Sequence, residues 1–221
     1  MKDLIIAGAS TPGSAKLVDD INLHSPTWNL IGYVDDDSEK WGADFFGYPV
    51  LGGISLLQDP EYQEAYTVCF IYGGTISTRI RVVTRMSTMG VRFATLVHPS
   101  VSTKRVEIGE DCVIQEGCFL NYGTVIGDHC IISPGTSVGH EVVLEENVFC
   151  ATRVTIPGRV TLKRNATVGA GAVLNGSITV GESSMVGLGA VVFRNVPDRC
   201  TVVGNPARVV LRDSVRGRRA L

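Results

Sequence analysis

Apolar side chains recur every six residues from Ile108 to Val192 in the second half of the chain. Fourteen of these fifteen positions hold Ile, Leu or Val, and the exception is Cys150. The residue two places earlier in each hexad is small or β-branched, so both point to the same face of a short strand. The last three places are rich in turn formers. Each hexad therefore predicts a strand and a corner, and three such sides close one coil of a stacked parallel β-helix.

The first half of the chain has a different pattern, in which apolar strands alternate with helices. Its first strand, residues 4–7, is apolar throughout, as in a buried parallel strand, and a glycine turn follows. The β-α-β-β-α-β order predicts a small open Rossmann-like parallel sheet that binds ligands at the carboxyl ends of its strands. The remaining elements are expected as a helix from Pro12 to about Asn22, strands at 30–34 and 66–72, a helix through Arg79 and Arg81 to Met89, and a strand at 93–97.

Two domains follow from these patterns: a Rossmann-like domain over residues 1–98 and a β-helix with a C-terminal tail over residues 99–221.

Three candidate ligand groups fall on one edge of the sheet. They are the glycine turn after the first strand, Asp35 and Asp36 after the second, and Gly73-Gly74 after the third. A helix N-terminus can bind phosphate, and the carboxylates could bind uracil N–H or ribose hydroxyl groups. The turn is not GxGxxG, so a tight turn into a packed helix explains it equally well.

Composition excludes several classes of partner. The chain is 44% hydrophobic and 19% charged with a net charge of −2, which is a globular composition without a basic nucleic-acid surface. No apolar run reaches the roughly 20 residues of a membrane span, and the N-terminus lacks a signal-peptide pattern, so we expect a cytoplasmic protein. Of the six cysteines, four occupy inward places of the hexads and none forms a CxxC pair, so we expect buried thiols and no metal. These four are Cys112, Cys118, Cys130 and Cys150.

The uninterrupted hexads, Gly139-His140-Glu141 and the GNPAR sequence at 204–208 carry a family resemblance over essentially the whole chain. The chain resembles the hexapeptide-repeat sugar O-acyltransferase and sialic-acid O-acetyltransferase-like family, including bacterial N-acetyltransferases that act on UDP-4-amino-4,6-dideoxy sugars. The resemblance implies a left-handed coil. Periodicity alone would not show this handedness, because ordinary parallel crossovers are right-handed. It also implies a homotrimer with active sites between neighbouring coils, a nucleotide-sugar substrate and acetyl-CoA as co-substrate.

Acetyl transfer to an amine needs a group that accepts the amine proton, and histidine is suited to that role near neutral pH. His24 and His98 are interpreted as surface or structural residues. His129 and His140 both lie at hexad corners, and the pattern alone does not separate them. The family's histidine stands in a Val-x-His-Glu/Asp setting, which only His140 meets. The resemblance thus implies His140 as the base and Glu141 as its carboxylate partner, with direct attack and no acyl-enzyme.

The same resemblance implies the ligand contacts. For the coenzyme these are Phe149, Gly158, Ala170 and Leu188, and for the nucleotide they are Ser10, Thr11, Pro12, Asp35, Asp36 and Gly74. Two departures affect substrate choice. The family often has histidine in place of Phe149, and its turn often reads Gly-His-Gly where this chain has Thr11-Pro12-Gly13.

Three other functions share features with this sequence. A γ-class carbonic anhydrase shares the coil but needs three zinc-binding histidines, and the repeats contain only two. An O-acetyltransferase acting on sialic acid or another sugar hydroxyl is the main alternative, because a histidine base serves a hydroxyl as well as an amine. A non-catalytic trimeric scaffold is the third, and His140-Glu141 and GNPAR argue against it.

Overall fold

The computed structural model describes residues 1–71 and 76–212, and the side chains of residues 76, 77 and 212 are left out. The chain divides into two compact units. The first comprises Met1–Val101 with Ile108–Glu116, and the second comprises Ser102–Glu107 with Gly117–Leu221. The first unit therefore includes part of the opening hexads, and the domain boundary at residues 98 and 99 stays a prediction.

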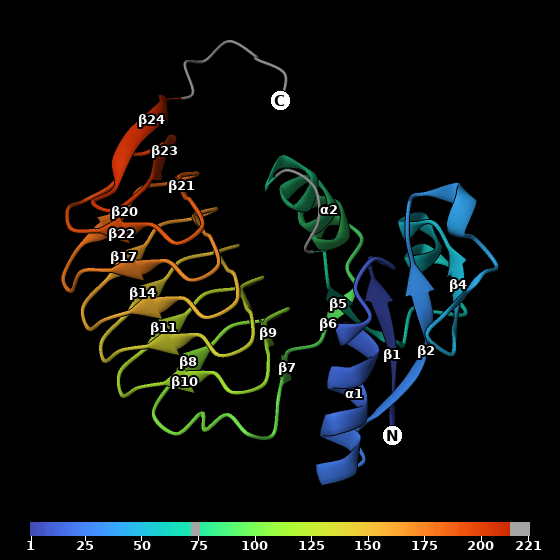
Figure 1. Ribbon diagram of the computed structural model, residues 1–221. Coiled ribbons are helices and arrows are strands. Elements are labelled where there is room, and N and C mark those ends of the chain that lie inside the picture. Colours follow the sequence, from blue (N-terminus) through green and yellow to red (C-terminus); the bar gives the residue numbers. More distant parts are fainter. Residues whose placement is uncertain (72–75, 213–221) are drawn as a thin grey trace. The chain divides into compact units, whose positions relative to one another are not determined.

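The first unit is an open α/β sheet, as the alternating pattern predicts (Figure 1). Its strand order is β3-β4-β2-β1-β5-β6, and all pairs are parallel except the antiparallel β3–β4 hairpin. The strands are β1 Lys2–Ala7, β2 Trp28–Val34, β3 Asp44–Phe45, β4 Tyr48–Gly52, β5 Tyr66–Cys69 and β6 Arg92–Phe93. The helices are α1 Gly13–His24 and α2 Ile76–Thr88, with short 3-10 turns η1 Ser38–Lys40 and η2 Ile54–Gln58.

The core of this unit follows the period of two along β1. Ile5 and Ala7 pack with Val82, Val83 and Met86 of α2 in one buried cluster. Alternate residues of a strand point to opposite faces, so Leu4 and Ile6, also fully buried, face the other side of the sheet. Both faces are covered, and the carboxyl ends of the parallel strands are left as the free edge for a ligand.

Several boundaries differ from the sequence expectations. The single strand expected at 93–97 is two strands, β6 in the α/β sheet and β7 (Leu96–Val97), which pairs with β9 (Val113–Ile114). The β3–β4 hairpin was not expected, because its strands are short and contain glycine and proline. Helix α1 begins at Gly13, one residue after the expected start at Pro12, which is the N-cap and gives no side-chain cap.

The second unit is a parallel β-helix of two-residue strands, and its hexad pattern is confirmed (Figure 1). Residues eighteen apart pair in register, for example Val138 with Ile156 and Leu162 with Val180. One face is formed by β10 Phe119–Leu120, β13 Ser137–Val138, β16 Thr155–Ile156, β19 Val173–Leu174 and β22 Val191–Val192. A second is formed by β8 Glu107–Ile108, β11 Val125–Ile126, β14 Val143–Leu144, β17 Thr161–Leu162 and β20 Thr179–Val180. The third contains β12 Ile131–Ile132, β15 Phe149–Cys150, β18 Thr167–Val168, β21 Met185–Val186, β23 Cys200–Val203 and the antiparallel β24 Arg208–Arg212.

The corners of the coil share one backbone conformation. The sixth place of every hexad from Asp111 to Gly189 has a positive φ between 52° and 70°, and most of these residues are not glycine. A left-handed residue with a side chain costs roughly 1–2 kcal/mol. Hydrogen bonds between coils offset that cost, as where the Glu141 amide donates to the Tyr122 carbonyl at 3.0 Å. The coils therefore fix each corner residue in place.

The aliphatic interior should account for much of the stability of the coil. Leu162 is fully buried, whereas its neighbour Thr161 is an outward-facing residue of the same strand. We expect Leu162→Ala to lower the free energy of unfolding by about 2–5 kcal/mol, and Thr161→Ala to change it by about 0.5 kcal/mol or less. Urea denaturation of the two variants measures both values. Equal losses would contradict the inward and outward assignment.

All six cysteines are buried and free, so the expectation of buried thiols is confirmed. Burial raises the pKa of the Cys150 thiol to about 12, so the thiol stays protonated and a poor nucleophile at neutral pH. Among the helices of residues 1–71 and 76–212, none is long and apolar enough to cross a bilayer.

Candidate active site

The candidate catalytic corner is built from fifth-place residues that stack eighteen positions apart. We call Tyr122, His140, Gly158, Gly176 and Arg194 the histidine column. The register of the strands before them fixes this stacking. The backbone of His140 is held on both sides, because Glu141 N–H donates to the Tyr122 carbonyl and Arg159 N–H donates to the His140 carbonyl at 2.9 Å.

The imidazole of His140 has a carboxylate partner. Its Nδ1 lies 3.1 Å from Glu141 Oε2, and both side chains are at least half exposed. An ionised carboxylate only accepts hydrogen bonds, so this contact favours the hydrogen on Nδ1 and leaves the lone pair on Nε2. The exposed imidazole is thereby oriented as a proton acceptor.

Gly158 makes room for that imidazole. A Cβ at this residue would lie 2.4 Å from His140 Nε2 and 2.6 Å from Cε1. No other side chain could occupy this place unless the ring moved. The glycine is therefore required by the ring position, since its φ is not in the left-handed region.

Beyond Gly158 the column stays without side chains for one further coil, at Gly176, and then reaches Arg194. Arg194 lines a cavity of about 530 Å³ at the end of the coil, together with Asn195, Pro206 and Arg208. The column therefore runs from an imidazole over two glycines to a cationic cavity. Pro206 and Arg208 belong to the GNPAR sequence that carried part of the family resemblance.

His129, the other corner histidine, differs from His140 in position and exposure. It occupies a sixth place with φ 60° and is 8% exposed. The side chain of His129 is therefore buried at its corner, whereas the side chain of His140, at a fifth place, is half exposed at the surface. The structure thus separates two histidines that both lie at hexad corners.

The other residues proposed as coenzyme contacts lie elsewhere on the coil. Ala170 and Leu188 are consecutive fifth-place residues of a different corner, and Phe149 is on β15, which precedes that corner. Leu188 is 78% exposed. Within one chain, only Gly158 among the four lies beside His140.

A second candidate site lies in the first unit, at the carboxyl ends of its strands. A cavity of about 280 Å³ is lined by Ser10, Asp35 and Asp36, which were expected there, and by Gly8, Lys40, Thr78 and Arg81. Thr11 and Pro12 lie in the turn into α1 and do not line it. Gly74 lies outside the described residues, so its expected contact is not described.

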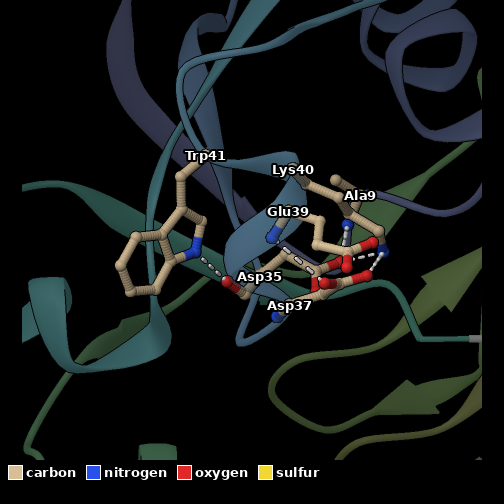
Figure 2. A network of polar contacts seen from close by, with 6 residues as sticks. All are labelled: Ala9, Asp35, Asp37, Glu39, Lys40 and Trp41. Atoms are coloured by element: carbon tan, nitrogen blue, oxygen red, sulfur yellow. Dashed lines mark hydrogen bonds and ion pairs between the residues drawn. The ribbon is translucent and has the colours of Figure 1, made fainter.

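Both oxygens of the Asp35 carboxylate at this edge are hydrogen-bonded within the protein (Figure 2). Oδ2 accepts from the Ala9 amide and from Lys40 Nζ, each at 2.9 Å, and Oδ1 accepts from the Asp37 amide at 3.0 Å. Burial by itself would raise the pKa of Asp35, but these hydrogen bonds outweigh burial and lower it below its usual value. Asp35 is therefore ionised at neutral pH and holds the glycine turn against the η1 loop.

Asp36 is also engaged. Its Oδ1 accepts from the Ile54 amide at 3.0 Å, and its Oδ2 pairs with Arg85 at 2.8 Å. The two carboxylates thus have structural partners before any ligand binds. Lys40, Arg81, Gly176 and Arg194 were not anticipated from the sequence. The last two could have been found by counting eighteen residues at a time from His140, but no local pattern marks the first two.

Among residues 1–71 and 76–212, no group of three or more His, Cys, Asp or Glu side chains could hold a metal ion. Comparison with known families gives two matches. The bacterial transferase hexapeptide, of six repeats, matches residues 105–140, and the PglD N-terminal domain matches residues 3–86. No curated protein matches the chain.

Solved structures match over nearly the full length. A histidine-to-asparagine variant of perosamine N-acetyltransferase from Caulobacter crescentus, in complex with CoA and GDP-perosamine, is 25% identical with a TM-score of 0.82, over 95% of this chain and 97% of that one. The acetyltransferase domain of PglB from Neisseria gonorrhoeae FA1090, in complex with acetyl coenzyme A, is 25% identical with a TM-score of 0.82, over 95% and 99%. WeeI from Acinetobacter baumannii AYE is 25% identical with a TM-score of 0.81, over 95% and 100%.

The coil and these likenesses define a left-handed β-helix acyltransferase. Within that class, the chain has a PglD N-terminal domain match and a hexapeptide-repeat match, and it is similar to sugar N-acetyltransferases. The fold class and the family resemblance expected from the sequence are therefore confirmed.

Proposed function

We propose that this protein transfers an acetyl group from acetyl-CoA to the amino group of a nucleotide-linked 4-amino-4,6-dideoxy sugar, with UDP as the nucleotide and His140 as general base. The observation that carries the proposal is the oriented imidazole of His140 above Gly158. Similar structures support the substrates, because one holds CoA with GDP-perosamine and another holds acetyl-CoA. We place the reaction in the cytoplasm, where acetyl-CoA is available.

The reaction is a direct displacement. The amine nitrogen attacks the thioester carbon, a C–N bond forms, and the C–S bond breaks. His140 Nε2 accepts the proton that the nitrogen loses, and the Glu141 carboxylate stabilises the resulting imidazolium through Nδ1. The CoA thiolate leaves and is then protonated.

The dimensions of the histidine column suit the coenzyme. Parallel strands stack about 4.8 Å apart, so the three coils from His140 to Arg194 span roughly 14 Å. The pantetheine arm between sulfur and phosphate is about as long as four extended residues, roughly 13–14 Å. A thioester at His140 would therefore place the coenzyme diphosphate near Arg194 and Arg208, where cations can bind it.

We include a homotrimer in the proposal. Ala170 and Leu188 lie at a different corner from His140, so a coenzyme touching all three needs two chains. Exposed apolar side chains on the coil, including Phe119, Met185 and Leu188, give that contact a surface to bury. Sedimentation of the purified chain as a monomer would contradict this part of the proposal.

The activity is tested by thiol release from acetyl-CoA with a panel of acceptors. UDP-, GDP- and dTDP-linked 4-amino sugars should be acetylated, with the amide product identified by mass spectrometry, and the UDP sugar should give the highest kcat/KM. Free sialic acid and serine are the hydroxyl-bearing controls. Turnover only with a hydroxyl acceptor would indicate an O-acetyltransferase. Absence of turnover together with absence of acetyl-CoA binding in calorimetry would indicate a scaffold.

A further inference from the structure

Three cationic side chains lie in or beside the cavity at the edge of the α/β sheet. Lys40 and Arg81 line it, and Arg85 lies beside it through its ion pair with Asp36. These three cations are not equivalent. Whether each one already has an anionic partner decides which of them can bind a ligand.

Lys40 and Arg85 are already paired. Lys40 lies 2.9 Å from Asp35 and 3.9 Å from Asp37, and Arg85 lies 2.8 Å from Asp36. Arg81 is exposed on α2, and among residues 1–71 and 76–212 it has no hydrogen bond or ion pair. It is therefore the one lining cation whose charge is uncompensated within the part of the chain that the structure describes.

Only part of the glycine turn, residues 8–14, can offer amides to an anion in the cavity. Gly8 has φ 108°, and a Cβ there would lie 2.8 Å from the Ile71 side chain, so the turn is tight. The Ala9 amide donates to Asp35, Pro12 has no N–H, and the Ser14 amide donates to the Thr11 carbonyl at 3.2 Å. Of the Ser10, Thr11 and Gly13 amides that remain, only that of Ser10 belongs to a residue lining the cavity. An anion in this cavity would thus depend on a side-chain cation more than a standard phosphate turn does.

We propose that Arg81 is a specificity-determining residue that binds the diphosphate of the nucleotide sugar, while Asp35 and Asp36 shape the cavity and do not read the base. The planar guanidinium can donate two parallel hydrogen bonds to phosphate oxygens. Arg81 would therefore discriminate diphosphate ligands from uncharged nucleosides. This inference rests on the proposed function, because it assumes that a nucleotide sugar enters this cavity.

Calorimetry of the full-length protein with UDP, GDP and the corresponding nucleosides tests the assignment. Arg81→Ala should weaken binding of the preferred diphosphate by about tenfold to a hundredfold, and should change the affinity for the nucleoside by about twofold or less. Arg81→Lys keeps a charge without the planar fork, so it should give an intermediate loss. Higher salt should weaken diphosphate binding to the wild type more than to Arg81→Ala.

Arg92→Ala is the matched control, because Arg92 pairs with Glu64 and does not line the cavity. Its diphosphate affinity should equal that of the wild type, and thermal melting of all variants reports on folding. Wild-type diphosphate affinity in Arg81→Ala, or an equal loss for the nucleoside, would overturn the role of Arg81 alone. A wild-type protein that binds neither diphosphate nor any nucleotide-linked amino sugar would overturn the proposed function and this inference with it.

Discussion

Replacing His140 with alanine is expected to lower kcat by about 10²–10⁴-fold, the usual contribution of a positioned general base. The amine would then lose its proton to water, without a preoriented acceptor. Affinity for acetyl-CoA should change little, because the proposed coenzyme path over Gly158 and Gly176 is made of backbone. Steady-state kinetics with the preferred amino sugar measure kcat, and calorimetry with acetyl-CoA measures binding.

His24→Ala is the matched control, since His24 is an exposed residue at the end of α1 and its loss should leave kcat unchanged. Glu141→Gln keeps a hydrogen-bond acceptor near Nδ1 at 3.1 Å but removes the charge, so we expect a smaller loss than for His140→Ala. A His140→Ala enzyme with wild-type kcat would eliminate the proposed base.

Replacing Gly158 with alanine is expected to lower kcat by about 10²-fold without unfolding the coil. The added Cβ would lie 2.4 Å from His140 Nε2, and real atoms cannot approach so closely, so the ring must turn away. A displacement of about 1 Å at a reacting group can cost this much. The backbone itself accepts alanine, because Gly158 has no positive φ. Thermal melting should therefore differ little from that of the wild type.

A double-mutant cycle distinguishes this cause from a general disturbance of the corner. If Gly158→Ala acts by moving His140, it should cost little further activity in the His140→Ala background, so the two losses will not add. At Gly176, a Cβ would lie no closer than 3.4 Å to its neighbours, so Gly176→Ala should leave the ring in place and alter the KM for acetyl-CoA more than kcat. Additive losses for His140→Ala and Gly158→Ala would contradict the steric explanation.

The coil could be predicted in detail because its rule is local and repeated. An inward residue every six positions from Ile108 to Val192 leaves one way to bury these side chains, and a single error would be corrected by the neighbouring hexads. The first unit lacks such redundancy. Its β3–β4 hairpin and the division of residues 92–97 between two sheets depend on which strands find partners, and short segments do not determine this by themselves.

The candidate site likewise contains residues that the sequence could identify and contacts that it could not reveal. His140 and Glu141 were chosen through the family setting, since a corner position is common to His140 and His129. Asp35 and Asp36 were expected to contact the nucleotide, but both carboxylates have protein partners. A charge pattern along the chain does not reveal such pairing, because Arg85 is far from Asp36 in sequence.

The amino-acid sequence by itself determined the class of fold and the six-residue geometry of the coil, because burial of aliphatic side chains at a fixed period needs no knowledge of distant residues. Only the tertiary structure decided which charges are free and which rings have room. It paired Asp36 with Arg85, left Arg81 unpaired among the described residues, and set His140 over Gly158. These outcomes depend on contacts between residues that are distant in sequence or one coil apart, and side chains acquire such neighbours only when the chain has folded.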